Sequence, residues 1–180
     1  RLVFYSGHGV QVKGRNYLLP VDTEIRGEEE MPAKSADLNE LLDRLAAVKQ
    51  GINIFILDAC RNNPFSGAEI VGPDGRRLKF RGVAAPGLAL VQAPLGSMVA
   101  FSTAPGGVAL DNPNERNSLY TKHLLAMMQT PGLPIELVFK QVRLGVARET
   151  GRAQVPWESS SLTGDFCFRQ SEQGACSAQR

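Results

Sequence analysis

Short apolar runs alternate along the chain with segments that place hydrophobic residues at helical spacing. Residues 2–6, 52–59 and 96–104 are mostly apolar and rich in β-branched or aromatic side chains. Such runs are typical of strands that are covered on both faces of a parallel sheet. A further strand is predicted over residues 161–168.

The segment between the first two runs has the spacing of an amphipathic helix. Its hydrophobic residues recur three and four positions apart, which places them on one face of a helix. Ser35 is the predicted N-cap, and Gly51 is the predicted stop. The residues predicted to form the apolar face are Leu38, Leu41, Leu42, Leu45 and Ala46.

Two more helices are predicted in the second half of the chain, over residues 117–129 and within 133–151. Pro134 lies near the first turn of the second helix, where proline is well tolerated. The alternation of strands and helices favours an α/β fold, a mostly parallel sheet flanked by helices on both faces. In the last helix the predicted core residues are Ile135, Val138, Phe139, Val142 and Val146.

Residues 61–95 interrupt this alternation. They contain many glycines and prolines, no clear periodicity and a basic segment, GRRLKFRG, at 75–82. Loops of more than about 12–15 residues in compact domains are usually functional or disordered. We therefore expect one domain over residues 1–169 with a long linker inside it, followed by a polar tail over 170–180.

Composition narrows the classes of partner. The 180 residues carry 20 basic and 18 acidic side chains, a formal net charge of +2, so nothing points to nucleic acid or to an anionic membrane. No apolar run reaches the roughly 18–20 residues that span a bilayer, and the chain shows no signal-peptide pattern. The expected partner is a protein or a small molecule, and the expected compartment is the cytoplasm.

The cysteines form an odd and sparse set, Cys60, Cys167 and Cys176. Their spacing is neither that of a disulfide framework nor that of a metal site. We therefore expect a reduced, intracellular setting, with Cys167 as a core thiol and Cys176 as a thiol of the tail.

The candidates for chemistry lie where two predicted strands end. The first strand leads into SGHG, with His8, and the second ends in LDACRN, with Cys60. In a parallel α/β sheet, sites form at the carboxyl ends of the strands. A cysteine beside an imidazole is a working nucleophile and base, because the imidazole takes the thiol proton and returns it to the leaving amine.

These two motifs resemble those of caspase-fold cysteine peptidases. The caspase signature places Ala-Cys after Gln, with a histidine about 50 residues upstream, and here His8 precedes Cys60 by 52 residues. Asp58 stands in place of Gln and Asn62 in place of the final Gly, so the resemblance is to the metacaspase, paracaspase and bacterial orthocaspase branch. It extends from Leu2 to about Phe168. It also implies an upstream strand and helices for which this sequence has no room, so an upstream segment or a second chain would complete the sheet.

The resemblance implies roles for the residues of both motifs. Cys60 would be the nucleophile and His8 the general base and acid. Backbone N–H groups of Gly9 and Cys60 would hold the oxyanion, and donors of this kind contribute about 3 kcal/mol each where they have been measured. A side chain at position 9 would crowd the scissile carbonyl, which gives a reason for glycine there.

Asp58 is the candidate for substrate selection. It lies two positions before Cys60 in a predicted strand and so points to the same side. In metacaspases and paracaspases a carboxylate at this place selects Arg or Lys before the cut bond, and Asp111 resembles a second acidic residue of the paracaspase pocket. A bidentate guanidinium–carboxylate pair gives directional recognition, whereas an aspartate substrate would be repelled. Asp22 and Glu115 are rivals of Asp111 for the second position.

The basic segment of the linker then has a predicted role, as a site of self-cleavage. Caspase relatives are often cut between the nucleophile strand and the next strand. An enzyme that cleaves after Arg or Lys would find its own sites there. The candidates for self-processing are Arg76, Arg77, Lys79 and Arg81.

Two other classes of function stay open at this point. The chain could be a catalytically inactive caspase-like module that binds proteins, or a hydrolase of non-peptide amides on the same sheet. The resemblance calls for no cofactor or metal, although some relatives bind calcium through acidic loops such as RGEEEMP. It favours a monomer. His123 is expected to be solvated or partly packed, and Trp157 either walls the substrate cleft or packs beneath the sheet.

Overall fold

The structure is a computed structural model of the chain. It describes residues 1–25, 27–48, 51–60, 69–71, 77–79, 88, 90–105, 107, 109–110, 115–172, 174 and 176, with the backbone alone for Cys60 and for the segments 69–71 and 77–79. The strands in these ranges are β1 (Leu2–Val12), β2 (Arg15–Leu18), β3 (Ala36–Asp37), β4 (Asn53–Cys60), β5 (Glu69–Val71), β6 (Arg77–Lys79), β7 (Ser97–Phe101) and β8 (Trp157–Ser160). The helices are η1 (Glu28–Glu30), α1 (Met31–Lys34), α2 (Leu38–Ala46), α3 (Leu119–Met128) and α4 (Ile135–Glu149).

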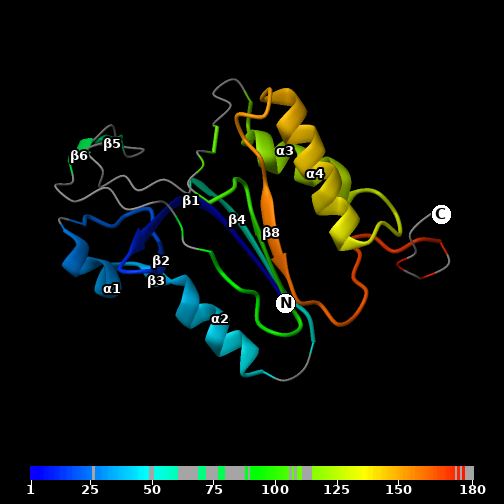
Figure 1. The fold of residues 1–180 in the computed structure, drawn as a ribbon, viewed down its shortest axis with the longest axis horizontal. Coiled ribbons are helices and arrows are strands. Elements are labelled where there is room, and N and C mark those ends of the chain that lie inside the picture. The colour runs from blue at the N-terminus through cyan, green and yellow to red at the C-terminus, as the bar shows by residue number, and fades with distance from the viewer. Residues whose placement is uncertain are drawn as a thin grey trace.

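Six strands form one mixed sheet in the order β3-β2-β1-β4-β7-β8 (Figure 1). The central strands β1, β4 and β7 run parallel to one another, as their apolar sequences predict. Strand β8 runs antiparallel to β7, and β2 runs antiparallel to the second half of β1. The predicted α/β class with a mostly parallel sheet is confirmed.

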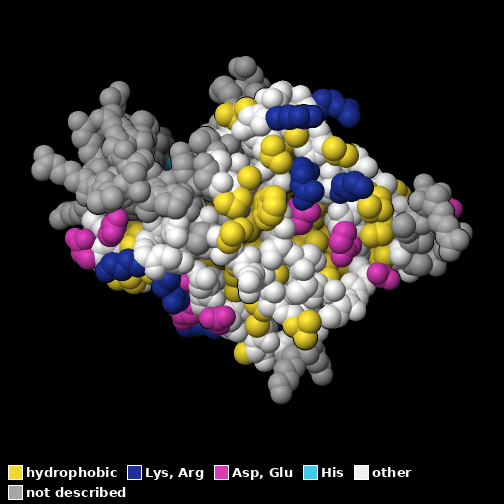
Figure 2. Space-filling view, in the orientation of Figure 1, with side chains coloured by type: hydrophobic (Ala, Val, Ile, Leu, Met, Phe, Trp, Pro, Cys, Tyr) yellow, Lys and Arg dark blue, Asp and Glu magenta, His cyan; other side chains and the backbone are white. Residues whose placement is uncertain are grey.

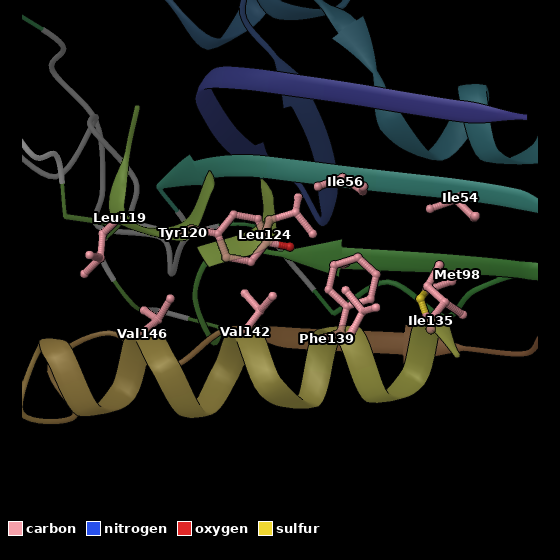
Figure 3. Close-up of a cluster of buried hydrophobic side chains, with 12 residues drawn as sticks. Ile54, Ile56, Met98, Leu119, Tyr120, Leu124, Ile135, Phe139, Val142 and Val146 are labelled. Carbon is pink, nitrogen blue, oxygen red and sulfur yellow. The ribbon is translucent and has the colours of Figure 1, made fainter. Parts of the chain in front are cut away.

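The sheet carries a hydrophobic core on each face. On one face, α3 and α4 pack on alternate residues of β4 and β7, such as Ile54, Ile56 and Met98 (Figure 3). On the other face, α2 covers Phe55, Leu57 and the intervening residues of β7. Every predicted core residue of the last helix, α4, is buried on the first of these faces. The alternation of sides along β4 therefore places odd-numbered residues toward α2 and even-numbered residues toward α3.

The first strand differs from its prediction because it changes partners. Residues 2–8 pair with β4, and Gly9 to Val12 then pair with β2 in a hairpin that the apolar pattern did not predict. Lys13 and Gly14 form its turn with φ angles of 49° and 80°, a conformation that glycine adopts without strain. The point at which β1 leaves β4 and joins β2 is His8.

Strand β8 is displaced from the predicted position. It covers Trp157–Ser160, whereas the strand was predicted over residues 161–168. Phe166 and Phe168 instead pack edge to face at 5.2 Å and contact the core beside α3 and α4 from a non-strand segment. The predicted strand over 161–168 is therefore wrong, although its two phenylalanines contact the core.

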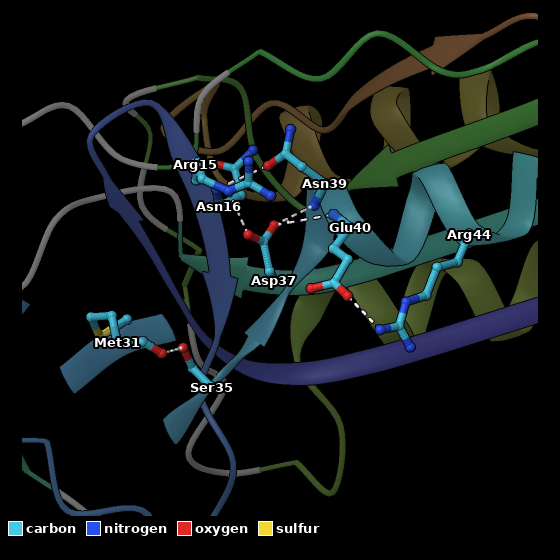
Figure 4. Close-up of polar contacts among 8 residues, drawn as sticks. All are labelled: Arg15, Asn16, Met31, Ser35, Asp37, Asn39, Glu40 and Arg44. Carbon is cyan, nitrogen blue, oxygen red and sulfur yellow. Dashed lines mark hydrogen bonds and ion pairs between the residues drawn. The ribbon is translucent and has the colours of Figure 1, made fainter. Parts of the chain in front are cut away.

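The predicted N-cap of α2, Ser35, is wrong. The helix is capped by Asp37 (Figure 4). The Asp37 carboxylate accepts the backbone N–H groups of Asn39 and Glu40 and also binds the Arg15 guanidinium at 2.5 Å. Hydrogen bonding to these groups and the charge of Arg15 keep the pKa of Asp37 below its usual value, against the effect of burial, which is the largest single influence. Ser35 lies in the C-cap of α1, with its hydroxyl on the Met31 carbonyl.

The expectation of unpaired cysteines outside the site is wrong. Cys167 and Cys176 form a disulfide that joins the polar tail to the domain. Cys167 is only 9% exposed, so the predicted core position is correct, but the spacing of two cysteines says nothing about whether their thiols meet. Cys60 is the one cysteine outside this bond.

Reduction of this disulfide should destabilise the chain. Closing a loop between residues nine positions apart lowers the entropy of the unfolded state, which corresponds to about 2–3 kcal/mol. For a chain of this size the melting temperature should fall by about 5–10 °C when dithiothreitol is added. Calorimetry measures the shift, and a double Cys167→Ala/Cys176→Ala variant should show none. Equal melting temperatures for the oxidised and reduced parent would contradict the prediction.

Candidate active site

The candidate nucleophile and base lie side by side in the central ladder. His8 of β1 is the direct partner of Cys60 of β4, and Ser6 is the partner of Asp58. Both pairs lie at the carboxyl end of the shared ladder, where the two strands separate. The His8 side chain is exposed to solvent. The strand pairing therefore brings the two predicted motifs to one edge of the sheet.

The backbone of His8 is held by two donors. Its carbonyl accepts the N–H of Leu19 at 3.0 Å and the Tyr5 hydroxyl at 2.8 Å, and that hydroxyl also lies 2.8 Å from the Leu19 carbonyl. Burial raises the pKa of Tyr5 to about 12, so the phenol retains its proton and remains a donor at neutral pH. The same phenol excludes a side chain from Gly7, because an added Cβ would lie 2.6 Å from its oxygen.

Gly9 is also confined, on the other side of His8. An added Cβ would lie 3.0 Å from Cδ1 of Leu88, which is buried over the strand as part of the core under α2. The sequence suggested that glycine leaves room here for a substrate carbonyl. The contact in the structure is with Leu88, a residue that the apolar pattern did not single out because it lies within the linker, where no clear periodicity was found.

Asp58 is buried, with 6% of its surface exposed, and it faces the start of α3. Its Oδ2 accepts hydrogen bonds from the hydroxyls of Ser118 and Thr121. Within the described part of the chain, no cationic side chain forms an ion pair with this carboxylate. A buried carboxylate that is bonded by hydroxyls and left without a counter-ion is suited to receive a cation.

Tyr120 lies next to these hydroxyl residues in α3. Its hydroxyl is fully buried and makes no hydrogen bond to any of the described residues. Burial raises its pKa well above the ordinary value, and the negative charges of Asp58 and Glu158 add to this effect. The phenol is therefore neutral, and it contributes volume to the core rather than charge to the site.

Gln154 was not singled out in the sequence, yet it joins three parts of the site edge. It is 1% exposed. Its side-chain amide donates to the Ser102 carbonyl at 2.8 Å, and its side-chain oxygen accepts the N–H of Leu110 at 2.9 Å. Ser102 in turn donates to the Ala59 carbonyl at 3.2 Å. These bonds fix the end of β7 and the loop after it against the strand that carries Cys60.

Several predicted residues lie outside what the structure describes. Asp111, Arg76 and Arg81 belong to this group. Arg77 and Lys79 belong to β6, which pairs with β5 in a small antiparallel sheet, and only their backbone is described. Of the two rivals of Asp111, Asp22 is exposed, and Glu115 forms an ion pair with Lys122 at 3.0 Å.

His123, the second histidine, is partly packed, as predicted. Its ring lies over Gly145 of α4, where an added Cβ would lie 2.5 Å from Nδ1. Its Nε2 lies 2.8 Å from Oε2 of Glu149, and Lys122 donates to Oε1 of the same carboxylate at 3.1 Å. Hydrogen bonds from Lys122 and His123 lower the pKa of Glu149. This cluster belongs to the contact between α3 and α4 and does not include the site residues.

Trp157 is exposed at 45% and starts β8, so it does not pack beneath the sheet. Figure 2 shows hydrophobic side chains gathered over the middle of the face on which Figure 1 places β8. Leu110, from the loop held by Gln154, is also exposed at 41%.

The acidic run of the sequence forms η1, in which Glu30 pairs with Lys34 at 2.8 Å. Over the described ranges, no group of three or more acidic, histidine or cysteine residues has the arrangement of a metal site. The same ranges contain no helix with the length and apolar content that crossing a bilayer requires.

Tyr5→Phe should destabilise the chain through the His8 carbonyl. Loss of one such hydrogen bond should lower the free energy of unfolding by about 1 kcal/mol. Urea unfolding at pH 8, monitored through Trp157 fluorescence, measures this difference. Because folding raises the Tyr5 pKa, the unfolded chain releases this proton first, and the stability of the parent falls as the pH rises from 10 toward 12. The gap between parent and variant should therefore shrink over that range. A constant gap would contradict the assignment.

Known protein families and solved structures include matches to this chain. The chain matches the model of the caspase domain, peptidase family C14, over residues 1–167. Its fold is similar to that of caspase-1 from Spodoptera frugiperda, with a TM-score of 0.51 and 19% sequence identity over 78% of this chain. The chain spans 57% of the length of that caspase-1 chain. No curated protein matches it. On the evidence of the family model, which covers nearly the whole sequence, the chain belongs to the caspase domain family of cysteine-type peptidases.

Proposed function

We propose that the chain is a cysteine endopeptidase that cleaves after Arg or Lys with a Cys60–His8 dyad. His8 takes the thiol proton, and the Cys60 sulfur attacks the scissile carbonyl. The C–N bond then breaks, and the amine leaves with the proton from His8. Water, deprotonated by His8, hydrolyses the thioester and regenerates the thiol. The pairing of His8 with Cys60 at the strand ends supports this assignment.

The oxyanion of the tetrahedral intermediate is held by the N–H groups of Gly9 and Cys60. Backbone donors of this kind are effective because they are already oriented before the charge develops. The bonds from Leu19 and Tyr5 to the His8 carbonyl support this role, since they fix the peptide unit that joins His8 to Gly9.

The observation that carries the choice of substrate is the environment of Asp58. Its carboxylate is buried, lies two ladder positions before the dyad, and is bonded by two hydroxyls. Burying an anion is costly unless it is paired. A cationic substrate side chain provides the pair, whereas an aspartate would add a second negative charge.

Self-processing belongs to the same proposal. The basic segment at 75–82 offers Arg76, Arg77, Lys79 and Arg81 to a site that accepts a cation. Mass spectrometry of the chain during prolonged incubation tests this step. Fragments that end at one of these residues would support it, and a chain that stays intact while peptide substrates are turned over would refute it.

The test of the whole proposal is the release of a fluorophore from three matched peptides that end in Arg, Lys or Asp. Turnover of the Arg and Lys peptides alone is the expected result. Turnover after Asp would remove Asp58 from the selectivity role but leave the peptidase in place. A chain that turns over none of the peptides would be better described as an inactive caspase-like interaction module or as an amidase of other substrates.

A further inference from the structure

The carboxylate of Asp58 is bonded asymmetrically. Both hydroxyls, from Ser118 and Thr121, donate to the same oxygen, Oδ2, with Thr121 at 2.6 Å. The hydrogen bonds recorded for the described residues include none to Oδ1. A carboxylate oxygen accepts about two hydrogen bonds, so Oδ2 is saturated and Oδ1 is the oxygen left to accept more.

The direction of these hydrogen bonds is fixed by the helix. The Ser118 oxygen accepts the backbone N–H of Thr121 at 3.0 Å and so caps α3. Its own proton is then directed to Asp58. Thr121 lies in the first turn of the same helix and donates beside it. Asp58 and the start of α3 therefore form one rigid unit, in which rotation of the carboxylate breaks two hydrogen bonds.

We propose that Ser118 and Thr121 are the residues that position the specificity carboxylate. By occupying Oδ2 they fix the plane of Asp58 and present Oδ1 as the single acceptor for the substrate cation. This inference rests on the proposed function. It also changes the expected contact, because a guanidinium that finds one open oxygen cannot form the two parallel bonds of a bidentate pair. The site should then discriminate strongly between charged and neutral substrate side chains, and only weakly between Arg and Lys.

The experiment compares kcat/KM for peptides that end in Arg and in citrulline, its neutral isostere. Thr121→Val keeps the shape of the side chain and removes the hydroxyl. The expected result is a fall of about 10-fold in the Arg-to-citrulline ratio, the size of one hydrogen bond to a charged group. The loss should appear mainly in KM. Thr121→Ser, which keeps the hydroxyl, should retain the parental ratio.

Three comparisons make the test decisive. Thr130→Val, at an exposed position just beyond the C-terminal end of α3, should leave kcat/KM unchanged for both substrates. Ser118→Ala should lower the ratio as Thr121→Val does, and Thr121→Ala serves in its place if the valine variant does not fold. An equal loss on both substrates in Thr121→Val would overturn the inference, because a purely structural role acts on both.

Asp58→Asn separates this inference from the proposed function. If Asp58→Asn lowers the Arg-to-citrulline ratio and Thr121→Val does not, the positioning role is wrong and the selectivity role of Asp58 stands. If Asp58→Asn leaves the ratio unchanged, the selectivity role is wrong, and the inference that depends on it falls as well. An Arg-to-Lys preference of 100-fold or more in the parent would refute the single-oxygen contact.

Discussion

Replacing Cys60 with alanine should abolish peptide turnover, with a loss in kcat of about 10⁴-fold or more. No described residue near the strand end offers a second nucleophile with a base as its direct ladder partner, as Cys60 has in His8. His8→Ala should cost about 10²–10⁴-fold, the usual contribution of a positioned acid and base. Steady-state kinetics on the preferred peptide measures both losses.

The pair should act as a unit. Because proton transfer and attack belong to one step, the double variant Cys60→Ala/His8→Ala should be no slower than Cys60→Ala alone. His123→Ala is the matched control, since His123 binds Glu149 at the contact of α3 and α4 and should leave turnover unchanged. Additive losses in the double variant, or a comparable loss in the control, would contradict the dyad.

The disulfide supplies a second measurement of the same prediction. With Cys167 and Cys176 joined, Cys60 is the one thiol available to iodoacetamide. The chain should incorporate one label, and turnover should fall in proportion to labelling. His8→Ala should slow the labelling at neutral pH, because the imidazole no longer takes the thiol proton. Full labelling with retained turnover would rule out Cys60 as the nucleophile.

The elements that the sequence predicted well are those whose burial is set by local pattern. The central strands and the helix from Ile135 have apolar residues at the periods that their packing demands, and the structure places them accordingly. The site followed from the same pattern, because the ends of parallel strands meet at one edge. His8 and Cys60 could therefore be paired without a structure.

The elements that were missed depend on contacts between distant segments. The hairpin after His8 needs a turn at Lys13, where a positive φ is unusual for a residue with a side chain. The Tyr5 bond to the His8 carbonyl and the clamp made by Gln154 join residues that the sequence pattern does not relate. Hydroxyls at positions 118 and 121 gave no sign of their contact with Asp58, since serine and threonine near a helix start are equally expected as simple caps.

The displaced strand has a related cause. Three of the four residues of Trp157–Ser160 are polar, which an edge strand tolerates because one of its sides faces solvent. The following run, with Phe166 and Phe168, has more apolar residues but fills the core without joining the sheet. The apolar content of residues 161–168 goes with their contact with the core. Which segment joins the sheet depends instead on pairing with the neighbouring strand β7.

Asp58→Asn should remove the preference for basic substrates, with a loss in kcat/KM of about 10²-fold or more for Arg and Lys peptides. The carboxylate is 6% exposed, and truncating one partner of a buried charge pair costs about 2–5 kcal/mol. Asparagine keeps the volume, and its side-chain oxygen still accepts the Ser118 and Thr121 hydroxyls, so folding should be preserved. Turnover of a citrulline peptide should change little.

The control for this variant is Asp43→Asn, which removes an exposed carboxylate from α2 on the opposite face of the sheet and should leave kcat/KM unchanged. A general effect of net charge would lower kcat/KM equally in both variants. This loss would become smaller as salt is added, since exposed charges are screened. A buried pair is screened much less. If Asp58→Asn still prefers Arg over citrulline by the parental factor, the cation is bound by another carboxylate, and Asp111 becomes the residue to replace next.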